Sequence, residues 1–462
     1  MMLKRPTRMG GMAARCMTLL LGGLLSLHAN AATDDGVSLP RPNIKIERAT
    51  LANGLQVLAV EDHSAPVITL ALTYDVGGAS ERRGRTGFAH LFEHLMFQGS
   101  DNVAPGQHLS VIEEYGGTAN ATTDTDWTFY FESVPANQLD LALFLEADRL
   151  RSLHISAQNL AKEKEVVKEE RRMRIDNQPY RKSFFEMLEL MYDSFAYSHD
   201  AVGSMSDLEA ASLEDVRGFF DTYYRASNVV LVLIGDFHTT QVMRKVERYF
   251  GDLPARAKPP AADRTEPRQQ EDRRRVVTDP LAPLPKLTLA FKTVPGNDPD
   301  YFALTVLSAV LQEGYSSRLH EELVKRRELV TTLSGSMDER RGAGALSIEA
   351  TLRSQEGIAA TQSAVYEQIE RLQREPIEDW ELEKAKNSIA ARYLNNLQRS
   401  VMRAIFIGVY AVDFNDPERI NTYLDRIAAV GKEDVQRVAN THLRKGNRTV
   451  VVTLPKRAEV AQ

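Results

Sequence analysis

The chain has 462 residues, with 63 Asp and Glu against 57 Lys and Arg, and a formal net charge of −6. This acidic balance argues against nucleic acid as a partner, because binding a phosphate backbone requires a basic surface. A chain of this length exceeds one ordinary domain of roughly 100–200 residues, so two or more domains are expected.

The first 31 residues have the pattern of a secretory signal peptide. A basic start without acids precedes an apolar run from Cys16 to Leu27 and the A-x-A sequence Ala29-Asn30-Ala31. The run is shorter than the roughly 20 residues that span a bilayer. We therefore expect export to the periplasm and no membrane span after cleavage; an uncleaved anchor is the alternative. Cleavage would remove the only cysteine and four basic residues, leaving a net charge of about −10.

The following segment, expected to form a first domain over residues 40–254, mixes strands and helices. Short β-branched or alternating runs predict strands, and longer periodic runs predict helices. The predicted strands are Gly54–Val60, Val67–Leu72 and Trp127–Phe131, and the predicted helices are Asn137–Arg151 and Leu160–Arg174. The pattern predicts an α+β fold, with one mainly antiparallel sheet and helices packed on one face.

One short run in this domain, residues 87–97, reads H-x-x-E-H on a helix with an apolar face. His90 and His94 are four residues apart, which places both imidazoles on one face of the helix. Such a pair can hold zinc at roughly 2.0–2.1 Å from each nitrogen. Glu93 lies beside that face and could take a proton from a water on the metal. The order inverts H-E-x-x-H and is typical of a zinc peptidase.

A third ligand is expected from the charged helix that begins at Leu160, because catalytic zinc usually has three protein ligands and an open position. Glu163 and Glu170 are seven residues apart, so their carboxylates project from the same side of this helix. The helix is highly charged, with a narrow apolar strip at Val166 and Val167. Surface glutamates that serve solubility are the alternative.

Taken together, these motifs resemble the M16 metallopeptidases, the group of pitrilysin, insulinase and the mitochondrial processing peptidase. The resemblance rests on His90, Glu93 and His94, followed after 75 intervening residues by Glu170. It extends to Gly116–Thr123, to Asp126–Tyr130 and to Tyr410–Pro417. It therefore covers nearly the whole chain after the signal peptide.

The resemblance implies that His90, His94 and Glu170 bind one Zn²⁺ per chain and that Glu93 is the general base. Glu163 would be the acid that supports the site. Glu169 remains a rival for the third ligand, because an error of one residue would exchange it with Glu170. An edge strand around Ala119, Asn120 and Ala121 would position an extended peptide substrate.

A proline-rich, charged stretch over residues 255–278 is expected to be an exposed linker to a second domain at 279–457. An internal repeat supports the division, because six residues of the first half recur 219 positions later. The pairs join Glu214, Asp215, Val216, Thr222, Arg225 and Asn228 to Glu433, Asp434, Val435, Thr441, Arg444 and Asn447. Two homologous halves are therefore predicted.

The second half is expected to carry no equivalent metal site. Aligning Gln98-Gly99 with Glu313-Gly314 places Thr305, Ser308 and Ala309 at the positions of His90, Glu93 and His94, and none of them can replace an imidazole. In the family, a C-terminal arginine and tyrosine hold the substrate and stabilise the oxyanion. Val324 and Thr331 stand at these two positions, unless a shifted alignment gives the role to Arg326 or Arg327.

The sequence thus predicts an exported zinc endopeptidase for peptides or unfolded segments. A sister M16-like subunit would supply the missing arginine and tyrosine, or a second copy would form a homodimer. The alternative is a non-catalytic assembly or peptide-binding subunit of such a complex.

Overall fold

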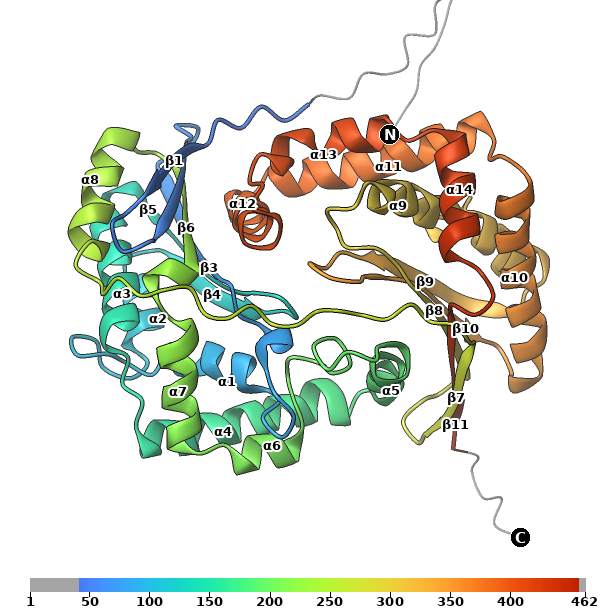
Figure 1. The fold of residues 1–462 in the computed structure, drawn as a ribbon, viewed down its shortest axis with the longest axis horizontal. Coiled ribbons are helices and arrows are strands. Elements are labelled where there is room, and N and C mark those ends of the chain that lie inside the picture. The colour runs from blue at the N-terminus through green and yellow to red at the C-terminus, as the bar shows by residue number, and fades with distance from the viewer. Residues whose placement is uncertain (1–40, 457–462) are drawn as a thin grey trace, which may run out of the picture. The chain divides into compact units, whose positions relative to one another are not determined.

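Two β-sheets, one in each half of the chain, organise residues 41–456, the range that the computed structural model describes (Figure 1). The predicted signal peptide lies outside the described residues. Within 41–456, no helix is both long enough and apolar enough to cross a membrane.

The first sheet has six strands in the order β1-β2-β6-β3-β5-β4. Only β2 and β6 pair in parallel, and every other neighbouring pair is antiparallel. The three predicted strands correspond to β2, β3 and β5, whereas β4 forms one edge of the sheet. The strands are β1 (Glu47–Thr50), β2 (Gln56–Glu61), β3 (Val67–Tyr74), β4 (Thr118–Thr123), β5 (Thr128–Pro135) and β6 (Val229–Gly235).

One face of this sheet forms the main apolar core with helices of the same half. Alternate residues of β3, namely Ile68, Leu70, Leu72 and Tyr74, point into this core. The helices of this half are α1 (Phe88–Leu95), α2 (Gln107–Glu114), α3 (Leu139–Ser152), α4 (Ala157–Arg171), α5 (Arg181–Met191), α6 (Met205–Ala210), α7 (Leu213–Tyr223) and α8 (Thr239–Phe250). Of these, α5 lies outside this core and packs in the apolar cluster at the second sheet. A π-helical turn at Arg172–Asp176 continues α4.

The second sheet repeats this topology without a counterpart of β1. Its order is β7-β11-β8-β10-β9, and only β7 and β11 pair in parallel. Its strands are β7 (Arg273–Asp279), β8 (Lys286–Lys292), β9 (Val330–Asp338), β10 (Ala345–Leu352) and β11 (Arg448–Pro455). The helices are α9 (Pro299–Gln312), α10 (Ile358–Arg374), α11 (Asp379–Leu397), α12 (Ser400–Phe414), α13 (Arg419–Ala428) and α14 (Lys432–His442).

The internal repeat corresponds to equivalent structure in the two halves. Helices α7 and α14 begin and end 219 residues apart. Asn228 donates from its Nδ2 to the carbonyl groups of Asp75 and Tyr223, and Asn447 donates in the same way to Lys292 and His442. The predicted α+β fold with two homologous halves is confirmed.

The opposite face of each sheet receives a helix from the other half, which the sequence did not predict. Figure 1 shows α12 beside β3 and β6 of the first sheet, and α5 beside β7 and β11 of the second. Gly408 of α12 allows this approach, because a Cβ there would lie 2.1 Å from Thr73 Oγ1. Ser183 of α5 bonds to Thr453 of β11 at 2.6 Å. The repeat offset of 219 relates the first residues of α5 and α12, so the exchange is reciprocal.

Two details differ from the sequence-based expectation. The stretch given to the linker includes the first residues of β7, which begins at Arg273, and Gln269 before it is only 2% exposed. Strand β7 begins with three consecutive arginines, so the segment resembles a linker in composition, although Arg275 pairs with Glu186 and Glu189 of α5. In α4, Val167 is fully buried but Val166 is 42% exposed, because adjacent helical residues face different directions.

Candidate metal centre

Helix α1 carries the H-x-x-E-H run, and its start is fixed by two neighbouring features. Gly87 before it has a φ of 84°, and a Cβ there would lie 2.6 Å from the carbonyl oxygen of Val202. The first backbone N–H groups, of Gly87 and Ala89, donate to the Glu81 carboxylate at 3.0 and 2.9 Å. The apolar face of α1 enters the core through Phe88, Leu91, Phe92 and Leu95. His90, Glu93 and His94 are thereby held on the opposite side of a well-anchored helix.

The two histidines meet Glu170, which lies at the C-terminal end of α4. His94 Nε2 lies 3.1 Å and His90 Nε2 lies 3.7 Å from Glu170 Oε2. Ligands at about 2.1 Å from a tetrahedral zinc ion lie roughly 3.4 Å from one another. The three side chains therefore fit a zinc ion in both chemistry and spacing. Glu169 points away, with 58% of its side chain exposed and an ion pair to Arg172, so the structure places Glu170 beside the histidines.

The charges around these ligands also fit a cation. Burial, followed by the nearby His94 charge, lowers the pKa of His90 to about 4. The contact with His94 lowers the pKa of Glu170 to about 2. Burial opposes the charging of His94, but contacts with Glu163 and Glu170 outweigh it and raise its pKa to about 9. A metal ion would replace that proton, since an imidazole must be neutral to bind it.

Glu163 and Glu93 are two further carboxylates near His94. Glu163 is 3% exposed, and its Oε2 lies 3.5 Å from His94 Nδ1, the nitrogen that faces away from Glu170. A carboxylate in this place orients a ligating imidazole. Glu93 Oε2 accepts a 2.6 Å hydrogen bond from Thr123 Oγ1 at the end of β4. Burial raises the pKa of Glu93.

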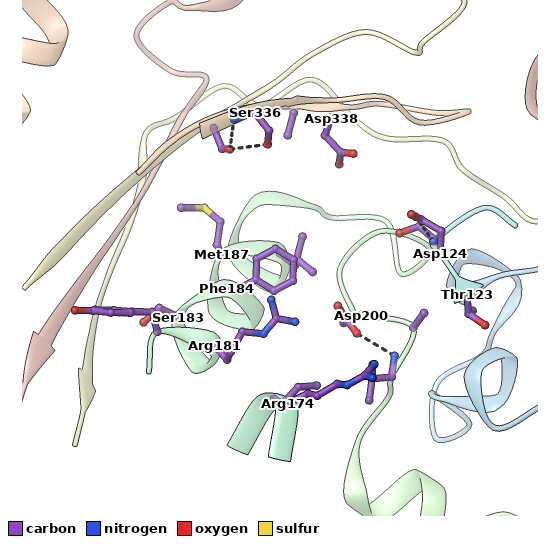
Figure 2. A pocket seen from close by; sticks show the side chains of 18 of the residues that line it. Thr123, Asp124, Arg174, Arg181, Ser183, Phe184, Met187, Asp200, Ser336 and Asp338 are labelled. Atoms are coloured by element: carbon purple, nitrogen blue, oxygen red, sulfur yellow. Dashed lines mark hydrogen bonds between the residues drawn. The ribbon is translucent and has the colours of Figure 1, made fainter. Parts of the chain in front are cut away.

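A cavity of about 770 Å³ opens beside these residues and is lined by both halves of the chain. Figure 2 shows Ser336 and Asp338 of β9 on one side of the cavity and Arg174 and Arg181 on the other. The edge strand β4 also reaches the cavity through Ala121, Thr122 and Thr123, whereas Ala119 and Asn120 lie outside its lining. The side chain of Asn120 accepts the N–H of Ala121 at 2.8 Å.

Several cavity residues were not predicted from the sequence. Arg174 Nη1 lies 2.6 Å from Glu170 Oε1, so it holds the carboxylate oxygen that faces away from the histidines. Its position four residues after Glu170 on a helix was a usable signal. Arg181 stacks on Phe184 at 4.7 Å, and its buried Nε has no partner among the described residues. Nothing in the sequence pattern distinguishes Arg181 from a surface arginine.

The four residues discussed for the family's arginine and tyrosine positions all lie outside the lining of this cavity. Arg326 and Arg327 instead pair with Glu322, and Arg327 also pairs with Glu367. Thr331 donates its hydroxyl to the carbonyl group of Thr351. The shifted alignment therefore gains no support from the position of either arginine. On α9, Thr305 bonds to Tyr301 and Ser308 bonds to Gln312.

Comparison with known proteins relates both halves of the chain to the M16 peptidases. Residues 56–200 match the family described as Insulinase (Peptidase family M16), and residues 210–389 match the Peptidase M16 inactive domain. The zinc protease PqqE of Helicobacter pylori is 30% identical over 89% of this chain and 93% of its own length.

Solved structures agree with these matches. A crystal structure of a protease from Helicobacter pylori has a TM-score of 0.85 and 30% identity, covering 89% of this chain and all of that one. The periplasmic protease PqqL of Escherichia coli shares the fold, with a TM-score of 0.75 and 16% identity. The match covers 90% of this chain but only 48% of PqqL. From the identity to PqqE over nearly its full length and the two matched domains, the chain belongs to peptidase family M16.

Proposed function

We propose that the chain is an exported zinc endopeptidase that hydrolyses peptides or unfolded segments. The observation that carries this proposal is the convergence of His90, His94 and Glu170 beside Glu93 at the wall of a cavity. Bound zinc would activate a water molecule and polarise the scissile carbonyl group. The name of the H. pylori relative, a zinc protease, is consistent with this chemistry.

The chain's own residues would position the substrate and move the proton. Glu93 would take a proton from the attacking water and deliver it to the leaving amine. The hydrogen bond from Thr123 leaves the other carboxylate oxygen of Glu93 for this task. Glu163 would keep the His94 ring in its ligating orientation.

An extended peptide is the substrate form that best suits the cavity. Strand β4 is an edge strand, so its outer backbone groups can pair with an added strand. Such a peptide at Ala119, Asn120 and Ala121 would replace the Asn120 side chain at the Ala121 N–H. The enclosed position between two halves favours short or unfolded segments over folded proteins.

We further propose that a sister subunit, or a second copy, completes the site. Val324 and Thr331 cannot supply the cationic fork and phenol that the family resemblance implies. The E. coli protease PqqL contains this fold within about half of its chain, which leaves room for a second such unit there.

A non-catalytic peptide-binding subunit is the second candidate, and the missing arginine and tyrosine favour it. Hydrolysis of a mixed pool of quenched peptides in the presence of zinc distinguishes a peptidase from a non-catalytic subunit. The chain is assayed alone and together with its sister subunit. Glu93→Gln should keep zinc and lose nearly all turnover, whereas Glu169→Gln on the exposed side of α4 should be active. If no mixture shows Glu93-dependent turnover, the peptidase assignment fails. Sequencing the N-terminus of periplasmic material tests export.

A further inference from the structure

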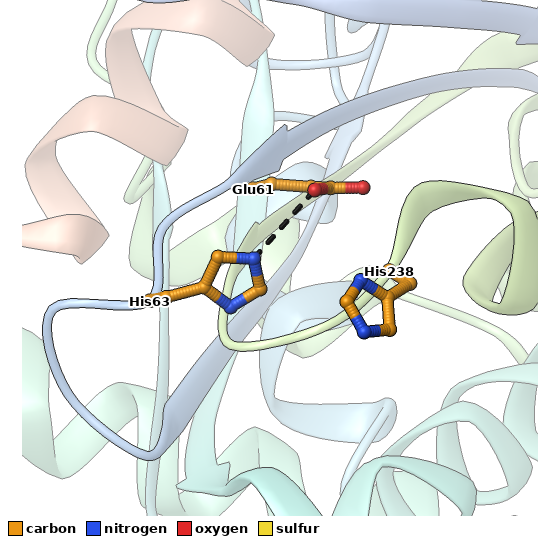
Figure 3. Close-up of side chains that lie close together, drawn as sticks. All are labelled: Glu61, His63 and His238. Atoms are coloured by element: carbon orange, nitrogen blue, oxygen red, sulfur yellow. Dashed lines mark ion pairs between the residues drawn. The ribbon is translucent and has the colours of Figure 1, made fainter.

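A second cluster of imidazole and carboxylate groups lies at an edge of the first sheet, apart from the residues of the zinc centre (Figure 3). Glu61 is the last residue of β2 and His63 lies two residues beyond it, while Asp236 and His238 lie in the first three residues after β6. These two strands are parallel neighbours, and Glu61 pairs in register with Gly235. Two acid-x-histidine sequences are therefore brought together from positions about 175 residues apart in the chain.

The geometry of the cluster suits a metal ion. Glu61, His63 and His238 each offer a ligand atom, and these atoms all lie within 4.8 Å of one another. The two imidazole rings are 5.6 Å apart and inclined by 57°, so they are not stacked face to face. Figure 3 shows both rings beside the Glu61 carboxylate, and His63 Nε2 lies 3.6 Å from Glu61 Oε2.

Asp236 supplies the outer contact that a ligating histidine usually has. Its Oδ1 lies 2.6 Å from His63 Nδ1, which fixes the ring and leaves Nε2 directed at Glu61. Metal-binding histidines commonly place their second nitrogen on a carboxylate in this way. The two oxygens of the Glu61 carboxylate have different partners. Oε1 accepts a hydrogen bond from the backbone N–H of Thr239, and Oε2 faces His63.

We propose that Glu61, His63 and His238 bind a second divalent metal ion, with Asp236 orienting His63. Two imidazoles and one carboxylate suit Zn²⁺ and the neighbouring late first-row metals. All three ligand side chains are exposed, so metal can enter from solvent without any rearrangement. The buried trio His108, Glu132 and Glu146 is a weaker candidate, because the Arg149 cation already pairs with Glu146.

The location gives such an ion a structural consequence. Asp62 lies between Glu61 and His63, and its Oδ2 accepts a 2.6 Å bond from Arg403 of α12. A metal at this site would therefore restrict the motion of the turn after β2. Through Asp62, this turn contacts α12, the helix from the second half that packs on the first sheet. Its role would be to stabilise this contact, separate from the chemistry at Glu93.

The test is calorimetric titration of the chelator-treated mature chain with Zn²⁺, without peptide. We expect two zinc ions per wild-type chain, and one in the His63→Ala/His238→Ala variant. His154→Ala is the matched control, because His154 is another exposed histidine beside a carboxylate, at 3.1 Å from Asp101, and belongs to none of the candidate metal-binding groups found within residues 41–456. It should still bind two ions. Asp236→Asn should weaken the second site roughly 10- to 100-fold.

The outcome does not depend on peptidase activity. The His90→Ala/His94→Ala variant should still bind one zinc ion per chain. This stoichiometry measures the second site separately from the predicted zinc centre. Melting curves of each variant establish that it is folded. The proposal is overturned if that background binds no zinc, or if removing His63 and His238 leaves the stoichiometry unchanged.

Discussion

Thr123 donates a 2.6 Å hydrogen bond from its Oγ1 to Glu93 Oε2, joining the last residue of edge strand β4 to the metal-centre helix α1. The bond selects one oxygen of the predicted general base and holds the carboxylate beside His94. A peptide that paired along β4 would therefore extend to Glu93, the predicted general base.

Thr123→Val should therefore reduce kcat more than it raises KM. A hydrogen bond to a charged group contributes about 1.5–3 kcal/mol, which corresponds to a loss of roughly 10- to 100-fold. Steady-state hydrolysis of a quenched peptide measures it. Thr118→Val, at the other end of the same strand and outside the cavity lining, is the control and should change kcat by less than about threefold. Equal losses in both variants would mean that the strand, rather than the bond, is responsible.

Glu163→Gln should weaken zinc binding without removing it. The glutamine keeps the size of the side chain near His94 Nδ1 but not its charge, and loss of such a supporting group costs roughly 10- to 100-fold in affinity. Competition with a chromophoric chelator gives the change. The control is Glu165→Gln on the same helix, whose carboxylate is 68% exposed and pairs with Lys168. An unchanged affinity for Glu163→Gln would assign Glu163 to packing alone.

Gly408→Ala should destabilise the protein although alanine favours a helix. The added Cβ would lie 2.1 Å from Thr73 Oγ1, so α12 would have to move away from the first sheet. Overpacking of this kind costs about 1–3 kcal/mol. Thermal unfolding measures the change. Gly218→Ala in α7 is the matched control, because a Cβ there meets nothing within 4 Å, and it should stabilise by up to about 1 kcal/mol.

Titration of Asp413 in α12 should lower the free energy of unfolding as the pH rises toward neutrality. The residue belongs to a largely buried group in which Arg341 bridges Asp413 and Asp75, while Asp126 accepts the Arg341 backbone N–H and the Arg264 side chain. Burial, followed by the charge of Asp126, raises the pKa of Asp413 to about 7. Between the ordinary aspartate pKa of about 4 and pH 7, the folded state then holds more protons than the unfolded state, so the free energy of unfolding decreases with pH.

The measurement is the melting temperature of the wild type and of Asp413→Asn at intervals from pH 4.5 to 8. Since other buried carboxylates also titrate, the difference between the two curves isolates Asp413. The wild type should lose stability relative to the variant up to about pH 7 and run parallel above it. Curves that stay parallel throughout would show that Asp413 is ionised across the whole range.

Much of the fold could be predicted from the sequence because its signals are local. Periodicity identified α1, α3 and α4, and the spacing of His90, Glu93 and His94 fixed which side chains share a helix face. The 219-residue offset, applied to the helices that the structure shows, also makes α5 and α12 equivalent. It could not show that each packs on the other half's sheet, because a repeat reveals equivalence but not which of two similar sheets a helix covers.

The candidate site could be predicted only in part, because tertiary packing brings some of its residues together. Glu170 follows from helix geometry and the family resemblance, whereas Arg181, Ser336 and Asp338 reach the cavity only through the packing of two halves. The cluster at Glu61 and His238 shows the same limit. Each acid-x-histidine sequence is unremarkable alone, and only the parallel pairing of β2 with β6 brings them together.

The reciprocal placement of α5 and α12 bears on how the chain acquires its structure. The first sheet lacks one of its covering helices until residue 414 has emerged, so we expect the half with the candidate metal centre to complete its fold only when α12 packs on it. Separately expressed halves should therefore be aggregation-prone, and should recover together only when mixed. Under the proposed export, this late completion would delay assembly of the proposed peptidase site until translocation is nearly over.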